Sequence, residues 1–307
     1  MCTRILYQSK NSEFIVGRTL DWEEDMKTDL WAFPSNLDRN GGVGPNSIKW
    51  NSKYGSVIAS GYNFCSVDGI NTEGLVANLL YLVESDYGNP LESKKPLLSI
   101  GAWLQYVLDN YPTVNDAVRE LSKEPFAIVA PRISTMQYPL PQTHGRPSSA
   151  HLAISDRTGD TAIFEYIEGK LKIYHDKKYT VMTNSPPFDK QQAIAAYWDA
   201  IGGAHFLPGG NRAADRFARM NWLLNSVPKA EDTGTSTAIT LSLMRSISVP
   251  LGLRDPELPN ISSTRWRTIS DTNLLRFYFE SVYSPQIFWV DLNKLNLDAT
   301  GSVAKLD

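Results

Sequence analysis

The chain has 307 residues, of which 42% are hydrophobic and 21% are charged, values typical of a globular protein with a full core. Its formal net charge of −3, without a long basic block, argues against binding to nucleic acid or to an anionic membrane through overall charge. No stretch approaches 18 consecutive apolar residues, so the sequence predicts no membrane span.

The first 22 residues predict a β-hairpin, with strands over 2–7 and 14–22 and a polar turn between them. A loop rich in proline, asparagine and glycine follows, and then two further strands over 54–63 and 74–83. Apolar residues at helical spacing after residue 97 predict a helix, and Thr113 can cap a second one.

The stretch near 129–148 is rich in proline and too broken for a strand or a helix. It predicts a long surface loop, and loops of this kind often carry function, so we expect it to lie at an active site. Beyond it the sequence predicts an antiparallel meander over 150–186. Three helices and a final set of strands complete the chain, near 188–200, 211–227, 236–247 and 264–292.

Strands and helices therefore come in groups and do not alternate strictly, which favours an α+β fold with antiparallel sheets. No linker, repeat or low-complexity tract divides the chain. We expect a single domain over residues 1–307.

Cys2 directly follows the initiator methionine, at a terminus that would ordinarily fray. If Met1 is removed, this residue carries both a thiol and a free α-amine. An α-amine titrates at about 7.7–8.0, so it can serve as the general base for its own thiol. The alternative is a small residue that simply starts a strand.

The remaining cysteine and the histidines add no second site. The four histidines show no ligand spacing, so no metal and no cofactor is predicted. Cys65 is expected to be a buried, inert thiol, although a disulfide with Cys2 is open in principle.

Arg18 and Asp21 end the second strand of the predicted hairpin, next to the start of the first. Arg18 could stabilise a thiolate by its charge, and Asp21 could hold the α-amine. Because residues 18 and 21 of a straight strand point to opposite faces, we expect the strand to stop or bend near Leu20 if both are to reach Cys2. A surface ion pair between Arg18 and Asp21 is the alternative.

Six features in sequence order resemble the choloylglycine hydrolase family of N-terminal nucleophile amidohydrolases, and within it the penicillin V acylases of Gram-negative bacteria. They are Cys2, GRTLDW (17–22), VMTNSPPFD (181–189), NRAADRFAR (211–219), NISSTRWRT (260–268) and IFWVDL (287–292). The resemblance covers nearly the whole chain. It implies a four-layer αββα sandwich with two antiparallel sheets, a homotetramer, and cleavage of linear amide bonds by an N-terminal cysteine without a metal.

The resemblance also assigns roles to individual residues. Cys2 matches the family's nucleophile, and Arg18 and Asp21 match the pair that orients and tunes it. Asn184 matches the asparagine whose amide N–H faces the oxyanion. Arg216 matches an active-site arginine, although its helical spacing to neighbouring arginines also fits a solvated face.

Tyr81 matches a position that contributes its backbone to the oxyanion hole and that is asparagine in bile salt hydrolases. The tyrosine therefore argues against conjugated bile salts as substrates. Trp22, Tyr81 and Tyr138 are expected to line a pocket for the acyl group, with core packing as the alternative for Trp22.

The resemblance implies two activities: removal of the phenoxyacetyl group of penicillin V, and deacylation of long-chain N-acyl-homoserine lactones. The second, quorum quenching, is the stronger physiological hypothesis. A bile salt hydrolase and a non-catalytic binding protein on the same fold are the alternatives. Relatives of the Gram-negative type are exported, so we expect a periplasmic protein in which Met1 replaces a cleaved signal, or a cytoplasmic one if Met1 is native.

Overall fold

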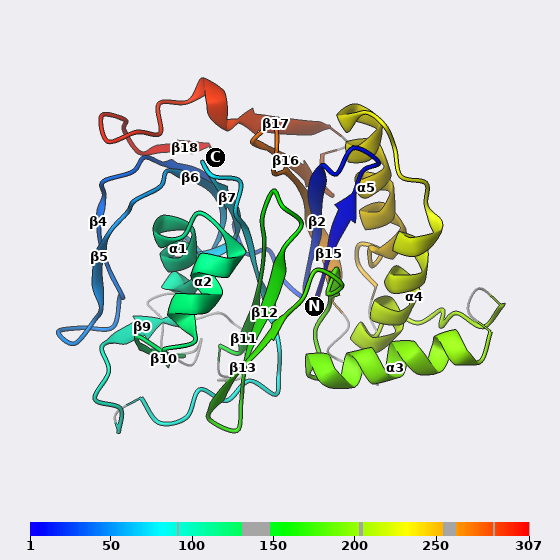
Figure 1. The fold of residues 1–307 in the computed structure, drawn as a ribbon, viewed down its shortest axis with the longest axis horizontal. Helices are drawn as coiled ribbons and strands as arrows, with labels where there is room; N and C mark the ends of the chain where they lie inside the picture. The colour runs from blue at the N-terminus through cyan, green and yellow to red at the C-terminus, as the bar shows by residue number, and fades with distance from the viewer. Residues whose placement is uncertain (91, 131–147, 203–204, 254–261, 285, 307) are drawn as a thin grey trace.

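Two large antiparallel sheets lie face to face in the computed structural model, with helices on both outer sides (Figure 1). The structure describes residues 1–306 except 91, 131–147, 203–204, 254–261 and 285. The layer order is helix, sheet, sheet, helix, which confirms the α+β sandwich expected from the sequence.

The first sheet has six strands in the order β14-β1-β2-β15-β16-β17. Its second and third strands, β1 and β2, form the hairpin predicted at the N-terminus and are paired antiparallel. The strands are β1 (Cys2–Gln8), β2 (Phe14–Trp22), β14 (Val181–Met182), β15 (Ser263–Asp271), β16 (Arg276–Ser281) and β17 (Ile287–Asp291).

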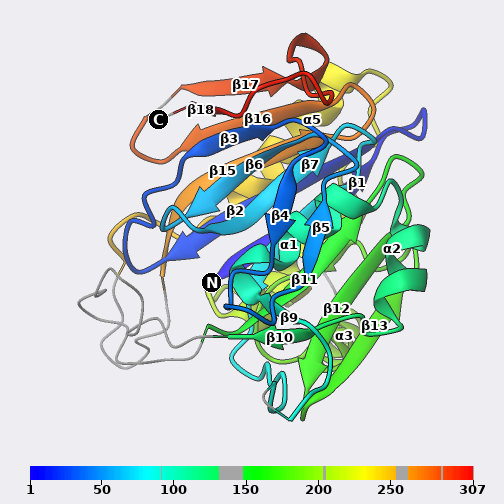
Figure 2. The ribbon, with the colours of Figure 1, turned by 90° about the vertical axis from the view of Figure 1, so that its left-hand side faces the viewer.

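The second sheet has eight strands in the order β13-β12-β11-β8-β7-β6-β3-β18. These are β3 (Leu30–Phe33), β6 (Ser56–Gly61), β7 (Cys65–Asn71), β8 (Val76–Tyr81), β11 (Ala150–Ser155), β12 (Thr161–Ile167), β13 (Lys170–His175) and β18 (Ala304–Leu306). Two small sheets pair β4 (Asp38–Asn40) with β5 (Lys49–Asn51), and β9 (Leu97–Ser99) with β10 (Ala127–Val129). Figure 2 views the molecule from the side of α1, α2, β4 and β5, so that the two large sheets lie one behind the other.

Five α-helices cover the sheets within the described residues. Helices α1 (Ile100–Asn110) and α2 (Val114–Leu121) pack on the eight-stranded sheet, and Thr113 caps α2 as predicted, accepting from the Asp116 N–H. On the other side, α3 (Phe188–Ala200), α4 (Ala213–Ser226) and α5 (Thr233–Ile247) cover the six-stranded sheet. A short 3-10 turn, Leu292–Lys294, follows β17.

Close packing of α5 against β2 depends on one glycine. A Cβ built on Gly17 would lie 2.8 Å from the side chain of Met244 on α5. The hairpin that carries Cys2 is thus pressed between the helical layer and the second sheet, and nearly all of its residues are buried.

Several short strands were not expected from the sequence, and two further differences bear on the surroundings of Cys2. β7, between the two predicted strands at 54–63 and 74–83, was missed because its residues 65–71 combine polar and glycine positions without alternation. The end of the predicted meander, β14, belongs to the six-stranded sheet, where it pairs with β1 and not with its neighbour β13.

Candidate active site

Cys2 opens β1, and the strand register determines what surrounds it. Cys2 lies opposite Leu20 and Arg4 opposite Arg18, so the even-numbered side chains of the hairpin share one face. That face looks toward the second sheet. The odd-numbered residues, including Asp21, look toward the helices.

The sulfur of Cys2 contacts a guanidinium from this inner face. Nη2 of Arg18 lies 3.5 Å from the sulfur and donates to the Leu79 carbonyl at 3.1 Å, while Nη1 donates to the Val67 carbonyl at 3.1 Å. The guanidinium also lies 4.5 Å from the ring centroid of Trp266. Two carbonyls from two strands therefore hold a cation beside the nucleophile.

Asn184 lies next to the backbone nitrogen of Cys2, because it follows β14 and that strand pairs with β1. Its Oδ1 accepts from the Cys2 N–H at 2.6 Å, and its Nδ2 donates to the Tyr81 carbonyl at 2.6 Å. An amide nitrogen carries two hydrogens, so a second one is left for a developing oxyanion. Asn184 thereby connects the nucleophile to the end of β8.

Arg216 reaches the same point from α4 and is completely buried. It donates to the Cys2 carbonyl at 2.7 Å, to Oδ1 of Asn184 at 2.9 Å and to the hydroxyl of Thr3. The solvated helical face that its spacing also allowed is therefore wrong for this residue. Burial lowers the pKa of Arg216 below its ordinary value, and Asp21 acts in the opposite direction.

Asp21 points away from the sulfur, toward the helices. Its Oδ1 accepts from Thr264 at 2.7 Å, and its Oδ2 lies 3.5 Å from Nη1 of Arg216 and makes no hydrogen bond. The expected stop or bend near Leu20 is wrong, because β2 continues to Trp22. The irregularity lies instead in the partner strand, where a bulge between Thr264 and Trp266 faces this part of β2.

The α-amine at the start of β1 is buried, with charged side chains around it. Burial lowers the pKa of the Met1 α-amine below its ordinary 8.0; Cys2 and Asp21 oppose this, and Arg216 and Arg18 add to it. The Met1 amine donates to the Asp21 carbonyl, and the Asp21 N–H donates to the Met1 carbonyl at 2.7 Å. A neutral amine, which can accept a proton, is therefore favoured at this end of the strand.

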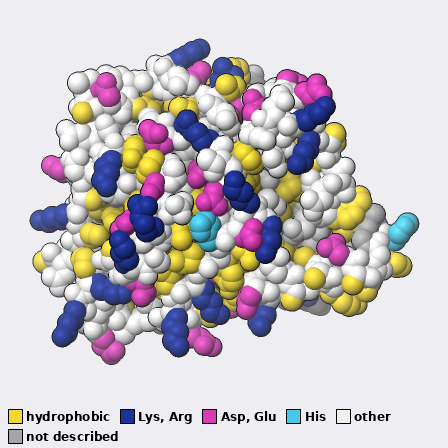
Figure 3. Space-filling model, in the orientation of Figure 1, with side chains coloured by type: hydrophobic (Ala, Val, Ile, Leu, Met, Phe, Trp, Pro, Cys, Tyr) yellow, Lys and Arg dark blue, Asp and Glu magenta, His cyan; other side chains and the backbone are white. Residues whose placement is uncertain are grey.

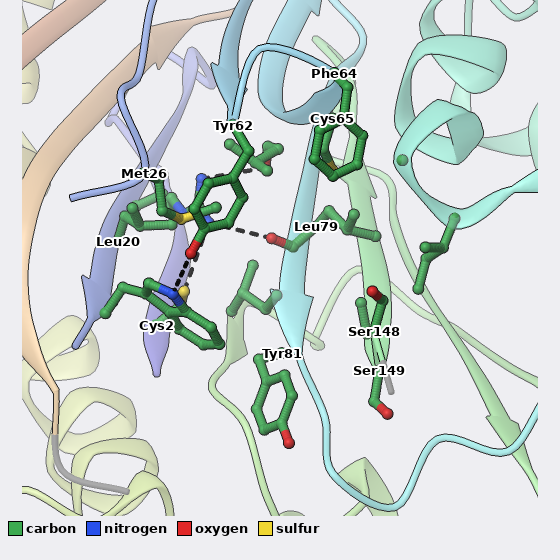
Figure 4. A pocket seen from close by; sticks show the side chains of 17 residues that line it. Cys2, Leu20, Met26, Tyr62, Phe64, Cys65, Leu79, Tyr81, Ser148 and Ser149 are labelled. Carbon is green, nitrogen blue, oxygen red and sulfur yellow. Dashed lines mark hydrogen bonds between the residues drawn. The ribbon is translucent and has the colours of Figure 1, made fainter. Parts of the chain in front are cut away.

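An apolar pocket opens beside the sulfur (Figure 4), with a volume of about 110 Å³. Trp22 and Tyr81 both line it, in edge contact with ring centroids 5.7 Å apart. Nε1 of Trp22 donates to the Tyr62 hydroxyl at 2.8 Å, so the indole is fixed in place. Tyr138 lies outside the described residues, as does most of the predicted loop near 129–148.

Cys65 lines the same pocket, yet it is chemically unlike Cys2. Both thiols are free. Burial raises the pKa of Cys65 to about 12, so it stays protonated at neutral pH and is a poor nucleophile. This agrees with the inert thiol expected from the sequence.

Behind Arg18 stands a buried carboxylate that sequence reasoning missed. Oδ2 of Asp68 lies 3.5 Å from Nη1 of Arg18 and accepts from Thr268 at 2.5 Å. Nδ2 of Asn78 donates to its other oxygen at 2.9 Å, and the Asn78 Oδ1 accepts from Nε of Arg4 at 3.3 Å. Burial raises the pKa of Asp68 above its ordinary 3.8, and Arg18 acts against that change.

Asp68 is thus a positioning residue for Arg18, which predicts a directional effect of removing its charge. Asp68→Asn leaves Arg18 beside the sulfur without its counter-charge, which favours the thiolate. We expect alkylation of Cys2 by iodoacetamide to extend to lower pH by about one unit, and kcat to fall about tenfold through looser orientation.

The matched control is Asp38→Asn, on the exposed side of β4. A folded Asp68→Asn protein with an unchanged alkylation profile would reduce Asp68 to a packing role. Loss of a buried charge partner is costly, so folding is checked by the thermal transition of each variant.

Within the described residues no cluster of histidine, cysteine, aspartate or glutamate has the geometry of a metal site. The described helices include none long and apolar enough to cross a membrane. On the face drawn in Figure 3, basic and acidic side chains are interspersed and do not gather by sign.

The chain is similar to known proteins over nearly its whole length. The family model described as linear amide C–N hydrolases, choloylglycine hydrolase family, matches residues 2–305. The chain is 46% identical to a penicillin V acylase of Pectobacterium atrosepticum over 327 aligned positions, covering 100% of this chain and 85% of that protein. It is 24% identical to a bile salt hydrolase/transferase of Clostridium perfringens, covering 97% and 94%.

Two solved structures share the fold of this chain over its whole length. The penicillin V acylase from Agrobacterium tumefaciens superposes with a TM-score of 0.90 at 49% identity, covering 100% of this chain and 91% of that one. A variant of the conjugated bile acid hydrolase from Clostridium perfringens reaches a TM-score of 0.82 at 20% identity, covering 100% and 97%, which shows the shared fold alone.

Proposed function

Because this chain belongs to the choloylglycine hydrolase family of linear amide C–N hydrolases, we propose that it removes the acyl group of penicillin V and of long-chain N-acyl-homoserine lactones through a thioester on Cys2. One observation carries the proposal. The sulfur of Cys2 forms the wall of an apolar pocket at the point where Arg18 and Asn184 converge on the same residue.

The reaction begins when Met1 has been removed. The neutral α-amine of Cys2 takes the thiol proton, and the sulfur attacks the amide carbonyl. Nδ2 of Asn184 and the backbone N–H of Tyr81 are the proposed donors to the oxyanion. The C–N bond then breaks as the ammonium returns the proton to the leaving amine.

Hydrolysis of the thioester restores the enzyme. The same α-amine takes a proton from water, and the hydroxide attacks the thioester carbonyl. Collapse of this second oxyanion releases the carboxylic acid and the Cys2 thiolate, which takes its proton back from the ammonium. Arg216 holds the carbonyl of Cys2 and the amide of Asn184 in position, and the carboxylate of Asp21 lies 3.5 Å from the same guanidinium.

The size of the pocket supports a single-ring or aliphatic acyl group. A closed cavity of about 150 Å³ binds benzene, and the pocket beside Cys2, at about 110 Å³, is smaller than that and can take at most a single ring. A phenoxy ring and the first carbons of a fatty acyl chain match that scale, whereas the four fused rings of a bile acid exceed it. Tyr81, with its ring in the pocket wall, also argues against conjugated bile salts.

The test measures amine release from penicillin V, N-dodecanoyl-homoserine lactone and glycocholate, with Cys2→Ala as the matched blank. Protein shown by intact mass to lack Met1 is expected to hydrolyse the first two and to leave glycocholate nearly intact. Glycocholate as the fastest substrate would favour the bile salt hydrolase alternative. Release that persists in Cys2→Ala would contradict the proposed nucleophile.

Two further proposals follow from the resemblance. A homotetramer is expected to give a light-scattering mass four times that of the chain. An exported enzyme is expected in the periplasmic fraction of its native cells, with Cys2 as the first residue of the mature protein.

A further inference from the structure

A second cavity adjoins the pocket beside Cys2, and the two share part of their lining. The second cavity has about 320 Å³, against about 110 Å³ for the first. Three residues line both: Phe64, Cys65 and Gly101. Figure 4 shows Phe64 and Cys65 on the side of the pocket away from Cys2.

The ring of Phe64 separates the two spaces. It follows a turn between β6 and β7 in which Tyr62 and Asn63 both have positive φ, 54° and 61°. A Cβ on Gly101 would lie 3.3 Å from this ring, so the glycine lets the ring rest against the first turn of α1. Phe64 is nonetheless 49% exposed, which leaves room for its side chain to rotate.

Its neighbour Tyr62 is held in place by contrast. The Tyr62 hydroxyl accepts from Trp22 at 2.8 Å and donates to Glu24 at 2.7 Å. A phenylalanine ring has no polar group that could fix it in the same way. Phe64 stacks on Tyr62 with ring centroids 6.3 Å apart, and this apolar contact can break while hydrogen bonds keep Tyr62 in the wall of the first pocket.

The second cavity is suited to an apolar occupant. Its walls include Trp31, Phe33, Trp50, Ile58 and Ala102. Several of the polar side chains there hydrogen-bond one another or neighbouring residues. Nε2 of Gln105 donates to Ser56 at 3.1 Å and to Asp109 at 2.7 Å, and the Ser66 hydroxyl donates to Oε1 of Gln105 at 3.2 Å.

The charge of Arg39 in the second cavity has a carboxylate beside it, although its Nε and Nη2 make no hydrogen bond. The guanidinium of Arg39 stacks over Phe33 at 4.2 Å from the ring centroid, and its Nε lies 3.4 Å from the carboxylate of Asp109. A hydrocarbon chain entering this space therefore covers aromatic surface without separating a polar pair.

We propose that the second cavity receives the distal end of a long acyl chain whose carbonyl is bound at Cys2, and that Phe64 sets how long a chain is accepted. A single ring fills the first pocket with Phe64 in its observed position. A chain that extends past this pocket must displace the ring and continue between Trp50 and Ala102. This inference rests on the proposed function, since it assigns the substrate class of the same site.

Kinetics with two chain lengths test the proposal. The readout is the ratio of kcat/KM for dodecanoyl- to hexanoyl-homoserine lactone, so the shorter chain is the internal reference. Each buried methylene contributes about fourfold, so Ala102→Leu, which fills the second cavity alone, is expected to lower the ratio at least tenfold. Phe64→Ala, which opens the passage, is expected to raise it about fivefold. Ratios that stay within twofold in both variants would overturn the proposal.

Binding provides a readout that does not depend on turnover. In Cys2→Ala, dodecanoyl-homoserine lactone is expected to change the tryptophan fluorescence, with most of the change lost in Cys2→Ala/Trp50→Phe. Ala102→Leu in the same background is expected to weaken binding at least tenfold. If no substrate is hydrolysed but the fluorescence changes as described in all three variants, the proposed reaction is contradicted and the binding of the acyl chain in the second cavity is supported. If substrates are hydrolysed and the fluorescence does not change, the proposed role of the second cavity is contradicted and the proposed reaction is retained.

Discussion

A protein that keeps a residue in front of Cys2 is expected to lose amide hydrolysis, with kcat/KM falling about 10²–10⁴-fold, the usual contribution of a general base. The change is a lysine inserted between Met1 and Cys2, which prevents removal of Met1. The nitrogen of Cys2 is then a peptide nitrogen, which donates to Asn184 at 2.6 Å but cannot accept a proton. Intact mass verifies the retained residues, and amine release from penicillin V gives the rate.

The thiol itself should survive this insertion. Arg18 still lies 3.5 Å from the sulfur, so iodoacetamide is expected to alkylate Cys2 while Cys65 remains protected by its raised pKa of about 12. Cys2→Ser, in which Met1 is still removed, is the complementary variant because it keeps the amine and weakens the nucleophile. Nearly full hydrolysis by the lysine-inserted protein would rule out the α-amine as the base.

The position of Arg18 beside Cys2 was predictable because a hairpin has a two-residue period. Once residues 2–7 and 14–22 are paired, even-numbered side chains share a face, and Arg18 must lie near the start of β1. The same period places Asp21 on the other face. The interpretation that both should reach Cys2 from one side required a bend that the strand does not have. Asp21 acts from the helical side, through Arg216 and the backbone of Met1.

The spacing of arginines along α4 was insufficient to predict that Arg216 is buried. Arginines at helical spacing fit a solvated face and a buried one equally well, because the spacing determines only which side chains point the same way. The packing of α4 on β1 decides that Arg216 points inward. Only the resemblance to a known family indicated this in advance.

Asp68 and Thr264 make contacts with the site that local sequence patterns could not predict. Asp68 lies on β7 and meets Arg18 of β2 across the two sheets, and Thr264 on β15 meets Asp21 across one strand pairing. Neither residue is part of a local spacing that signals chemistry. Contacts of this kind depend on sheet order and on the stacking of the layers, which local periodicity does not define.

The second large effect is expected for Asn184→Asp, with kcat falling about 10²–10³-fold, as for the loss of an oxyanion-hole donor. Aspartate keeps an oxygen where Asn184 accepts from Cys2 and Arg216, so the position of the nucleophile is retained. It cannot supply the two N–H groups of Nδ2, so the oxyanion loses its donor. Its added charge faces Arg216, which limits the cost to folding. The measurement is kcat and KM for penicillin V, with Asn225→Asp on the exposed end of α4 as the matched control.

Alkylation separates the two roles of Asn184. The reaction of a thiolate with iodoacetamide forms no oxyanion, so a residue that serves only the transition state of amide cleavage leaves its rate nearly unchanged. We therefore expect Asn184→Asp to be alkylated at Cys2 within about threefold of the parent rate while it hydrolyses penicillin V slowly. Parallel loss of both reactions would mean that Asn184 acts by holding the amine and sulfur of Cys2 in place, and the oxyanion would then depend on the backbone at Tyr81 alone.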